Sequence, residues 1–531
     1  MSHRSEPTSE QLSAEHNIAS LITQHAQREH PALIAPAGDT QVSISYPQLN
    51  AAAARVQQYL SEQGIVPGDR VALSMPNIPL MPALYYGIVA SGALCVPVNP
   101  LLSGAELTHQ LQDSGAKLLL AWEGTRLADE APSTVPVRNG SVSVQIFSAE
   151  AFAQTGSLLA PFHESGAQLE PVAVKPNTPA LILYTSGTTG RAKGATLTHA
   201  NILSNARSCV DAFEFHAEDI VFGGLPLFHA FGQTVSMNAV FAVGATTALL
   251  PRFVPADALE LLASARVSVL AAVPTMYLAL ITALEQNQDA ARELQGKIRF
   301  GISGGAPLPA SAHHALDSLI ACPIYEGYGL SETSPVVSFN QKKYGLKIGS
   351  VGRAIDGVQV QVRDMDGTVL EPGEAGQLWV GGECVMAGYW NNPQASEAVL
   401  DNGWFATGDV ARLDEDGNIF IVDRIKDMVL RNGYSVYPRE VEDILYTHPA
   451  VATAAVVGVP HEQHGEEVVA VIVLREGYDE RIVQPALDAL AREQLAAYKF
   501  PRRYIFVDAM PLGATGKILK KDLRAKLSEK E

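Results

Sequence analysis

A stretch of small, hydroxylated and basic residues has the composition that phosphate binding requires. The segment 184–194, YTSGTTGRAKG, directly follows the apolar run 180–183. Its three glycines let the backbone approach a ligand closely, and its hydroxyls and lysine offer donors to phosphate oxygens. It is not the common ATPase loop, because two residues separate Gly190 from Lys193. Taken alone, the segment is equally compatible with a phosphate cradle and with a plain surface loop.

Further segments with residues suited to chemistry follow this loop along the chain. They are 225–229 (LPLFH), 303–307 (SGGAP), 328–333 (YGLSET), 407–409 (TGD), 423–427 (DRIKD) and 516–517 (GK). In type and in order, these segments and the loop resemble the adenylate-forming superfamily, which includes acyl-CoA synthetases, luciferases and the adenylation domains of peptide synthetases. The resemblance is highly specific, because a chance match to all of them is negligible.

The resemblance implies an enzyme that joins a carboxylic acid to AMP, releases pyrophosphate and passes the acyl group to a thiol. The nearest likeness is to bacterial fatty-acyl-CoA ligases, through the segments 325–332, 335–338, 402–405 and 434–438. ATP, Mg²⁺ and coenzyme A are the implied cofactors and co-substrates. Because a carboxylate and a triphosphate are both anions, cationic and hydrogen-bonding groups must stabilise the charge of the transition state.

Four residues have catalytic roles by this resemblance. Lys517 matches the adenylation lysine that bridges the substrate carboxylate and the α-phosphate, and Glu332 matches the metal-binding carboxylate. Ser331 is expected to hydrogen-bond the α-phosphate, and His229 lies where the family has a residue near the reacting carboxylate. Without the other motifs, a lysine near the chain end or a glutamate in a turn would be a solvated surface charge.

The nucleotide contacts are also implied by the resemblance. Tyr328 and the turn 304–307 are expected to hold the adenine between them, while Asp409 and Arg424 bind the ribose hydroxyls. A carboxylate suits a vicinal diol, since both of its oxygens accept hydrogen bonds. The full expected set is Thr185, Ser186, Gly187, Thr188, Thr189, Gly190, Lys193, Gly304, Gly305, Ala306, Pro307, Tyr328, Gly329, Asp409, Arg424 and Gly433.

The acyl pocket and the hinge complete the implied site. Phe231, Gly232 and Gly327 are expected to line the acyl pocket together with Gly304, and the apolar segment 230–232 favours a fatty or other apolar acid. Lys426 stands at the family's hinge between an adenylating and a thioester-forming pose. Gly433 lies on the face that enters the site for the second half-reaction, where Asn432 replaces the lysine of luciferase-like and coumarate-type relatives.

The elements that must position these residues alternate between helix-like and strand-like patterns. This alternation predicts an α/β fold: a large N-terminal domain of layered α/β subdomains with a small β-rich subdomain, then a small mobile α/β C-terminal domain. We expect domains at 1–424 and 428–531, joined by a hinge at 425–427. Helices are predicted at 47–61, 80–90, 438–446, 485–494 and the basic C-terminus, and strands at 71–74, 94–98, 358–363, 377–380, 452–457, 468–473 and 504–507.

Composition narrows the function classes. The chain has 531 residues, a formal charge of -18 and a pI of about 5.2, so nucleic acid is not expected as a partner. The cysteines lack paired spacing, which favours reduced buried thiols in a cytoplasmic protein. The uncharged stretch 267–284 is split by Pro274, which favours a buried strand and a helix over stable membrane insertion. The amino terminus is polar, so a secretory signal is not expected there.

Alternatives of different classes stay open. The acceptor thiol could belong to a separate acyl carrier protein, and the fold could serve a non-catalytic nucleotide sensor, although a sensor would not need Lys517. A homodimer is also compatible with the sequence. The segments 313–317 and 461–464 only superficially resemble catalytic or zinc motifs and are predicted to be surface residues. Lys520, Lys521 and Arg524 are predicted to form a solvated helix face, with contact to CoA phosphates as the less favoured reading.

Overall fold

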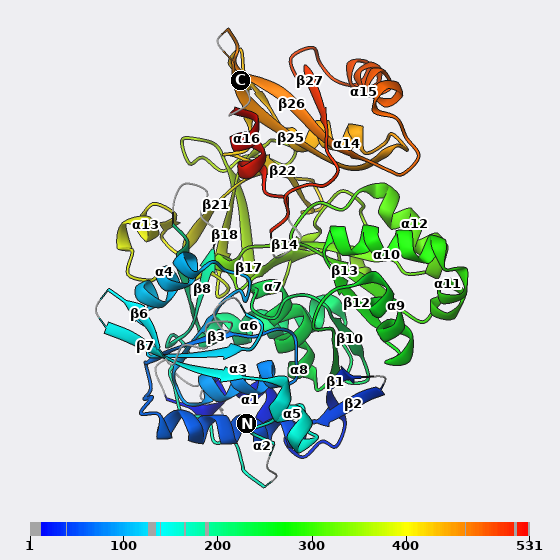
Figure 1. Ribbon diagram of the computed structural model, residues 1–531. Coiled ribbons are helices and arrows are strands. Elements are labelled where there is room, and N and C mark those ends of the chain that lie inside the picture. The colour runs from blue at the N-terminus through cyan, green and yellow to red at the C-terminus, as the bar shows by residue number, and fades with distance from the viewer. Residues whose placement is uncertain are drawn as a thin grey trace, which may run out of the picture.

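A computed structural model describes residues 12–38, 40–125, 134–138, 140–163, 166–185, 191–461, 463–513 and 518–528. The predicted residues 186–190 of the phosphate loop and Lys517 lie outside this described part. Within it, sheets and helices form a large N-terminal part that carries a smaller C-terminal part (Figure 1). The predicted α/β fold class is therefore confirmed.

The first sheet has a parallel centre with antiparallel edges. Its strand order is β19-β9-β8-β4-β3-β5-β7-β6. The centre pairs in parallel, as expected for strands separated by helices, whereas β9 returns directly after β8 and pairs with it antiparallel. Its strands are β3 (Arg70–Ser74), β4 (Leu94–Pro97), β5 (Leu118–Trp122), β6 (Thr134–Val137), β7 (Gly140–Phe147), β8 (Pro179–Thr185), β9 (Lys193–Thr198) and β19 (Gly388–Tyr389).

The second sheet also has a parallel centre with antiparallel edges. Its order is β16-β15-β14-β13-β12-β10-β11-β1-β2, and the run from β14 to β1 is parallel. Parallel strands end at one edge of the sheet, so the segments that follow β10, β13 and β14 meet there. Its strands are β1 (Pro31–Ala37), β2 (Thr40–Ser45), β10 (Ile220–Gly223), β11 (Thr246–Leu249), β12 (Val269–Ala272), β13 (Phe300–Ser303), β14 (Ile324–Gly329), β15 (Val336–Phe339) and β16 (Arg353–Ala354).

Helices fill the space between these two sheets and cover their outer faces. The helix α3 is buried along its whole length, which requires packing on all sides. Tyr86 on α3 donates a hydrogen bond to Asn238 (2.8 Å), and both belong to the interior between the sheets. Helices α9 to α12 lie on the outer side of the second sheet (Figure 1). The helices are α1 (Ser20–Thr23), α2 (Tyr46–Glu62), α3 (Leu80–Ala90), α4 (Gly104–Ser114), α5 (Ala149–Thr155), α6 (His199–Phe213), α7 (Ala230–Gln233), η3 (Thr234–Asn238), α8 (Ala239–Val243), α9 (Pro255–Ser264), α10 (Pro274–Gln286), α11 (Gln288–Leu294), α12 (Ala310–Ile320) and α13 (Pro393–Glu397).

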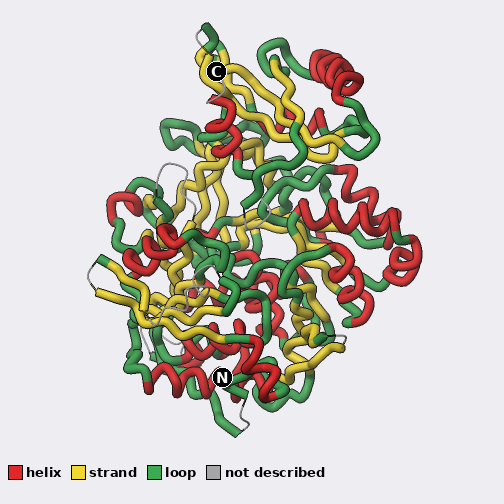
Figure 2. Tube along the Cα trace, viewed as in Figure 1, coloured by secondary structure: helices red, strands yellow, loops and turns green. Residues whose placement is uncertain are grey.

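An antiparallel sheet lies between the large sheets and the C-terminal part, as the yellow strands near the centre of Figure 2 show. The predicted strands at 358–363 and 377–380 are confirmed, and the sheet continues to Arg424, further along the chain than the predicted β-rich stretch. It has its own buried cluster, which includes Val362, Leu378 and Ile419. Its strands are β17 (Val358–Arg363), β18 (Gly376–Gly382), β20 (Leu400–Asp401), β21 (Trp404–Leu413) and β22 (Ile419–Arg424).

The C-terminal part forms a separate sheet with a separate core. Its buried residues include Val456, Ala470 and Leu487, and its predicted helices and strands are confirmed. The sheets change between Arg424 and Val429, which brackets the predicted hinge; the hinge role itself stays a prediction. The elements are β23 (Val429–Arg431), β24 (Tyr434–Val436), α14 (Pro438–Leu445), β25 (Val451–His461), β26 (Gly465–Leu474), α15 (Glu480–Gln494), β27 (Arg503–Phe506) and α16 (Lys520–Ser528).

The C-terminal helix α16 is not the fully solvated face that its basic residues predicted. Lys520 pairs with Glu442 on α14 (2.7 Å), and Arg524 pairs with Asp427 beside the hinge (2.9 Å). Burial lowers the pKa of Lys520, but the carboxylates of Glu442 and Asp423 outweigh burial, so that its pKa is raised. The helix is therefore tied to the hinge region by charge, and of the three basic residues only Lys521 is exposed as expected.

The predictions on cysteines and on membrane spanning can also be compared with the structure. Cys95, Cys209, Cys322 and Cys384 are all free and buried, as predicted. The stretch 267–284 contains strand β12 and most of helix α10, with Pro274 at the start of the helix. Across the described residues, every helix is too short or too polar to cross a lipid bilayer.

Candidate active site

Predicted site segments gather where strands of the large sheets end. The phosphate loop follows β8, the segment with His229 follows β10, and the turn 304–307 follows β13. The short helix η4 (Ser331–Thr333) follows β14 and lies against β9 of the other sheet. Loops at the carboxyl ends of parallel strands are the usual ligand-binding position in α/β proteins. The two sheets therefore bring segments far apart in sequence to one place.

Asp409 is the buried centre of a hydrogen-bonded cluster. It is 3% exposed and accepts a hydrogen bond from the hydroxyl of Tyr328 at Oδ2 (2.5 Å). Arg424 Nε lies 3.3 Å from its Oδ1, because Asp409 and Arg424 are directly paired between β21 and β22. Burial, followed by the charge of Asp409, holds the pKa of Tyr328 well above its usual value. The tyrosine stays protonated and orients the carboxylate, so the three predicted nucleotide residues do meet.

Glu332 is held by a tyrosine that the sequence analysis missed. The hydroxyl of Tyr389 donates to Glu332 Oε1 (2.9 Å), and the amide of Met386 donates to the Glu332 carbonyl (2.9 Å). Lys193 Nζ lies 5.0 Å from the centre of the Tyr389 ring. Burial, and then the charge of Glu332, raise the pKa of Tyr389. One aromatic ring thus connects the end of the phosphate loop to the predicted metal-binding carboxylate.

No sequence motif pointed to Tyr389. It lies in the short strand β19, which pairs with β9 far upstream in the chain. Only that pairing places it between Lys193 and Glu332. The local sequence Ala387-Gly388-Tyr389 is too common for a role of the tyrosine to be predicted from it.

The turn 304–307 presents its surface to solvent. Gly305 has a φ of +83°, a backbone conformation that favours glycine, and both Gly305 and Pro307 are exposed. Gly304 lies against Phe231: a Cβ atom there would stand 3.0 Å from the ring. The turn is therefore accessible on one side and packs against α7 on the other.

The predicted acyl-pocket residues are only partly brought together. Phe231 and Gly304 are in contact, but the missing side chain of Gly232 faces the carbonyl of Pro226, 2.3 Å from an added Cβ. Gly327 similarly faces Phe339 and the backbone of β15. These two glycines are explained by close packing of the protein itself, and their absent side chains open no space toward a ligand. His229 caps α7, its Nδ1 accepting from the amide of Phe231 (3.3 Å).

Several predicted residues lie beside or outside the described part of the chain. Ser186, Gly187, Thr188, Thr189, Gly190 and Lys517 are not described. Thr185 and Lys193 are paired opposite each other at the ends of β8 and β9, immediately before and after the loop. Leu512 and Ile518 form an isolated bridge on either side of the segment with Lys517. Ser331 and Gly329 adjoin Glu332 and Tyr328, whereas Ala306 lies in the exposed turn.

The residues of the C-terminal part form a tight hairpin. Gly433 has a φ of +80° in the Asn-Gly turn between β23 and β24, a turn type that such residues favour. Asn432 pairs with the ring of His464 (2.8 Å). Both Gly433 and Lys426, the predicted hinge residue, are exposed, and their predicted roles stay predictions.

Three side chains of types that bind metal ions lie near this hairpin. Among the described residues, His461, His464 and Glu467 place one ligand atom each within 4.8 Å of one another. Glu467, however, is paired with the buried guanidinium of Arg431 (2.7 Å). This positive charge opposes the binding of a cation there, so the carboxylate of Glu332 is the better candidate for Mg²⁺.

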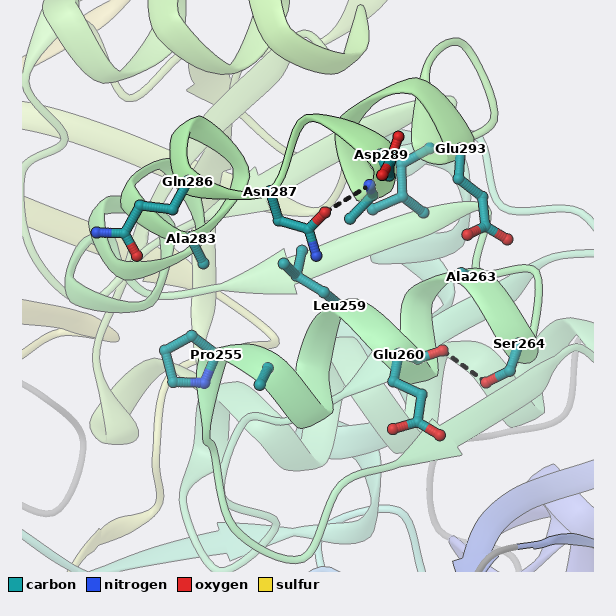
Figure 3. Close-up of a pocket in the computed structure, with 13 residues that line it drawn as sticks. Pro255, Leu259, Glu260, Ala263, Ser264, Ala283, Gln286, Asn287, Asp289 and Glu293 are labelled. Atoms are coloured by element: carbon teal, nitrogen blue, oxygen red, sulfur yellow. Dashed lines mark hydrogen bonds between the residues drawn. The ribbon is translucent and has the colours of Figure 1, made fainter.

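A groove on the outer helices lies away from the predicted site. It has a volume of about 740 Å³ and lies between α9, α10 and α11, with Leu259 at its floor and Glu260, Asp289 and Glu293 along its rim (Figure 3). None of the predicted site residues lines it. We therefore assign the reaction to the strand ends and not to this groove.

Comparison with known proteins identifies the family. The sequence model described as AMP-binding enzyme matches residues 22–390, and that of the AMP-binding enzyme C-terminal domain matches residues 440–517. The chain belongs to the AMP-binding enzyme family. The expected superfamily is therefore confirmed, and relatives named as long-chain-fatty-acid–CoA ligases and a feruloyl-CoA synthase confirm the expectation of an AMP-forming acid–thiol ligase of the acyl-CoA synthetase class.

Individual relatives of this family member cover nearly its whole length. A long-chain-fatty-acid–CoA ligase of Yersinia pestis is 35% identical over 89% of this chain and 87% of its own. A feruloyl-CoA synthase of an Amycolatopsis species is 36% identical over 91% of this chain and 94% of its own. The crystal structure of ATP-bound MatB from Rhodopseudomonas palustris superposes with a TM-score of 0.86 at 32% identity, covering 97% and 99% of the two chains.

We expect the substitution Asp409→Asn to weaken nucleotide binding about tenfold or more, the effect of one lost charge-assisted hydrogen bond. The amide keeps the shape of the side chain but loses the charge that pairs with Arg424. Isothermal titration with a non-hydrolysable ATP analogue measures the effect. The matched control is Asp416→Asn, an exposed aspartate that lies 3.9 Å from Arg353. If both variants bind the ATP analogue as tightly as the unmodified protein does, Asp409 does not contribute to nucleotide binding.

Proposed function

We propose that this family member activates a fatty or other apolar carboxylic acid with ATP and transfers the acyl group to coenzyme A. The observation that carries the proposal is the cluster of buried Asp409 with Tyr328 and Arg424, which lies near the strand ends with the turn 304–307 and Glu332. The names of the relatives support the acid–CoA reaction, and they include both a fatty acid and an aryl acid as substrate. The apolar segment around Phe231 supports an acid without a second charge.

In the first half-reaction, the site residues hold the nucleotide for attack. The accessible turn 304–307 and Tyr328 hold the adenine. Asp409 accepts hydrogen bonds from the ribose hydroxyls, and Arg424 donates hydrogen bonds to them. The acid's carboxylate oxygen forms a bond to the α-phosphorus, the bond between the α-phosphorus and the bridging oxygen breaks, and pyrophosphate leaves. Lys517 neutralises charge on the two reacting anions, as a flexible ammonium group can.

Mg²⁺ fits the oxygen chemistry of Glu332. This carboxylate is 8% exposed, and Tyr389 uses only one of its oxygens, so the other can face a hard cation. When bound, the ion supplies positive charge to the triphosphate oxygens and the leaving pyrophosphate. Tyr389 keeps the carboxylate oriented, and Lys193 adds positive charge at the end of the phosphate loop.

In the second half-reaction, the thiol sulfur attacks the acyl carbonyl carbon. The carbon–sulfur bond forms, the carbon–oxygen bond to AMP breaks, and the thiol proton is released. Coenzyme A is the proposed acceptor, while a phosphopantetheine arm on a separate carrier protein is the second candidate. The non-catalytic sensor is disfavoured because Lys517, Glu332, Asp409 and Arg424 are all present. A homodimer and a cytoplasmic location stay predictions.

We expect acid-dependent release of pyrophosphate in the presence of ATP and Mg²⁺. The measurement uses a panel of acids from acetate through long-chain fatty and aryl acids, with and without coenzyme A. Formation of an acyl-CoA supports the proposal and ranks the substrates by kcat/KM. Release of pyrophosphate without transfer to coenzyme A would favour the carrier-protein reaction, and no release with any acid would favour the sensor.

We expect Lys517→Ala to lower the rate of acyl-adenylate formation at least about a hundredfold, a typical effect of removing one transition-state charge contact. The affinity for ATP should change little, because the adenine and ribose contacts stay in place. Single-turnover pyrophosphate release and equilibrium binding of ATP measure the two effects separately. Lys521→Ala, at an exposed lysine of α16, is the matched control. Unchanged adenylation in the Lys517 variant would contradict its assigned role.

We also propose that the segment 425–427 joins the domains 1–424 and 428–531 as a hinge. Lys426→Pro is expected to slow acyl transfer to coenzyme A about a hundredfold while leaving adenylation nearly unchanged, because proline fixes φ and blocks the rotation. Rapid-quench measurement of both half-reactions tests this expectation. Lys426→Ala keeps the backbone free and serves as the control. Parallel losses in both half-reactions would count against a hinge at this residue.

A further inference from the structure

A histidine and a glutamate form a buried pair behind the predicted adenine site. His313 on α12 and Glu326 on β14 are each 3% exposed, and His313 Nε2 lies 3.2 Å from Glu326 Oε1. The prediction that the segment 313–317 is a surface segment is thus wrong for His313 and Leu316. This residue shares the inward face of α12 with Ala312, Leu316 and Ile320, whereas His314 points to solvent.

The second oxygen of the same carboxylate holds the turn that follows β13. The amide of Leu308 donates to Glu326 Oε2 (3.1 Å), and Leu308 directly follows Pro307. In the sheet, Glu326 is the direct partner of Ser303, the residue before the turn. The carboxylate therefore joins the far end of the turn 304–307 to the strand that continues into Tyr328.

The strand side of this connection is also firmly held. The amide of Asn340 donates to the backbone carbonyl of Glu326 (2.9 Å), and the Asn340 side chain reaches the carbonyl of Ser350 (2.7 Å). Glu326 therefore has little freedom to follow the turn if the turn moves. Any displacement of the turn relative to Tyr328 must stretch the bond between Leu308 and Glu326.

The chemistry of the pair determines which atom carries the proton. A carboxylate can only accept hydrogen bonds, so His313 Nε2 is the atom that donates. His313 Nδ1 is buried and has no hydrogen-bond partner among the described residues. A buried carboxylate requires donors for its oxygens, and here the amide of Leu308 and the ring of His313 supply one each.

We propose that Glu326 is a positioning residue for the adenine of ATP, setting the gap between the turn 304–307 and Tyr328, and that His313 orients its carboxylate. Glu326 does not touch the ligand in this proposal; it acts through the backbone of the turn. The inference rests on the proposed nucleotide site. Substitution of Glu326 or His313 should weaken the binding of ATP without weakening the binding of the acid or of coenzyme A.

The test compares steady-state kinetics of variants at the pair. Glu326→Gln leaves one of the two donors without an acceptor, since the amide nitrogen of glutamine cannot accept. We expect the KM for ATP to rise about tenfold, the effect of one such lost hydrogen bond, while kcat and the KM values for the acid and coenzyme A change less than about threefold. His313→Leu, which removes the donor, should give the same pattern.

Two controls separate positioning from stability. His313→Gln keeps a donor and should restore a KM for ATP close to that of the unmodified protein, and His314→Leu changes the exposed neighbour on the same helix. Partial unfolding lowers kcat in proportion to the active fraction without raising the KM for ATP. A fall in kcat alone, an equal rise in all KM values, or a failure of His313→Gln to restore the KM would each overturn the inference.

A direct binding measurement keeps the inference separate from the proposed reaction. The dissociation constant of a non-hydrolysable ATP analogue should rise about tenfold in Glu326→Gln. If the unmodified protein binds the analogue but turns over no acid, the proposed reaction fails and this inference is still tested by the analogue. If the protein is active and the analogue binds equally to the variant and the unmodified protein, only the inference fails.

Discussion

A negative charge buried between sheets constrains much of this structure. Asp409 is nearly inaccessible to water, and a buried carboxylate is costly unless donors and a countercharge reach it. Tyr328 comes to it from the end of β14, and Arg424 comes from the adjacent strand β22. The antiparallel sheet must therefore pack against the end of the second sheet with little freedom. The same packing fixes the place where the nucleotide is proposed to bind.

Glu332 follows the same physical rule at the junction of the two large sheets. Its partner Tyr389 is carried by a strand that pairs with β9, whereas Glu332 itself follows β14. The buried carboxylate of Glu326 is held in the same way, by donors from the ring of His313 and the backbone amide of Leu308. Three carboxylates near the strand ends are thus each held by a partner from another segment. An electrostatic site arranged in this way needs little reorganisation when charge develops in the transition state.

The small C-terminal part is held to the rest of the chain differently, in a way that suits its proposed rotation. It has its own core, and polar contacts such as the ion pair Arg524–Asp427 and the hydrogen bond from the amide of Arg439 to Asp423 link it to the residues before Val429. Burial favours the neutral form of Asp427, but the charges of Lys520 and Arg524 outweigh it and lower its pKa. Polar contacts of this kind can exchange for water or for other partners at lower cost than a continuous apolar core.

The sequence by itself determined the family, the α/β fold class and most element positions, because hydrophobic periodicity and a string of ordered motifs are local properties of the chain. It also indicated that Asp409, Arg424 and Tyr328 belong together. Only the tertiary structure revealed Tyr389 beside Glu332, the burial of His313 and the packing reasons for Gly232 and Gly327. These features depend on contacts between residues far apart in the chain. Such contacts follow from strand order and layer packing, which no local pattern of residue types records.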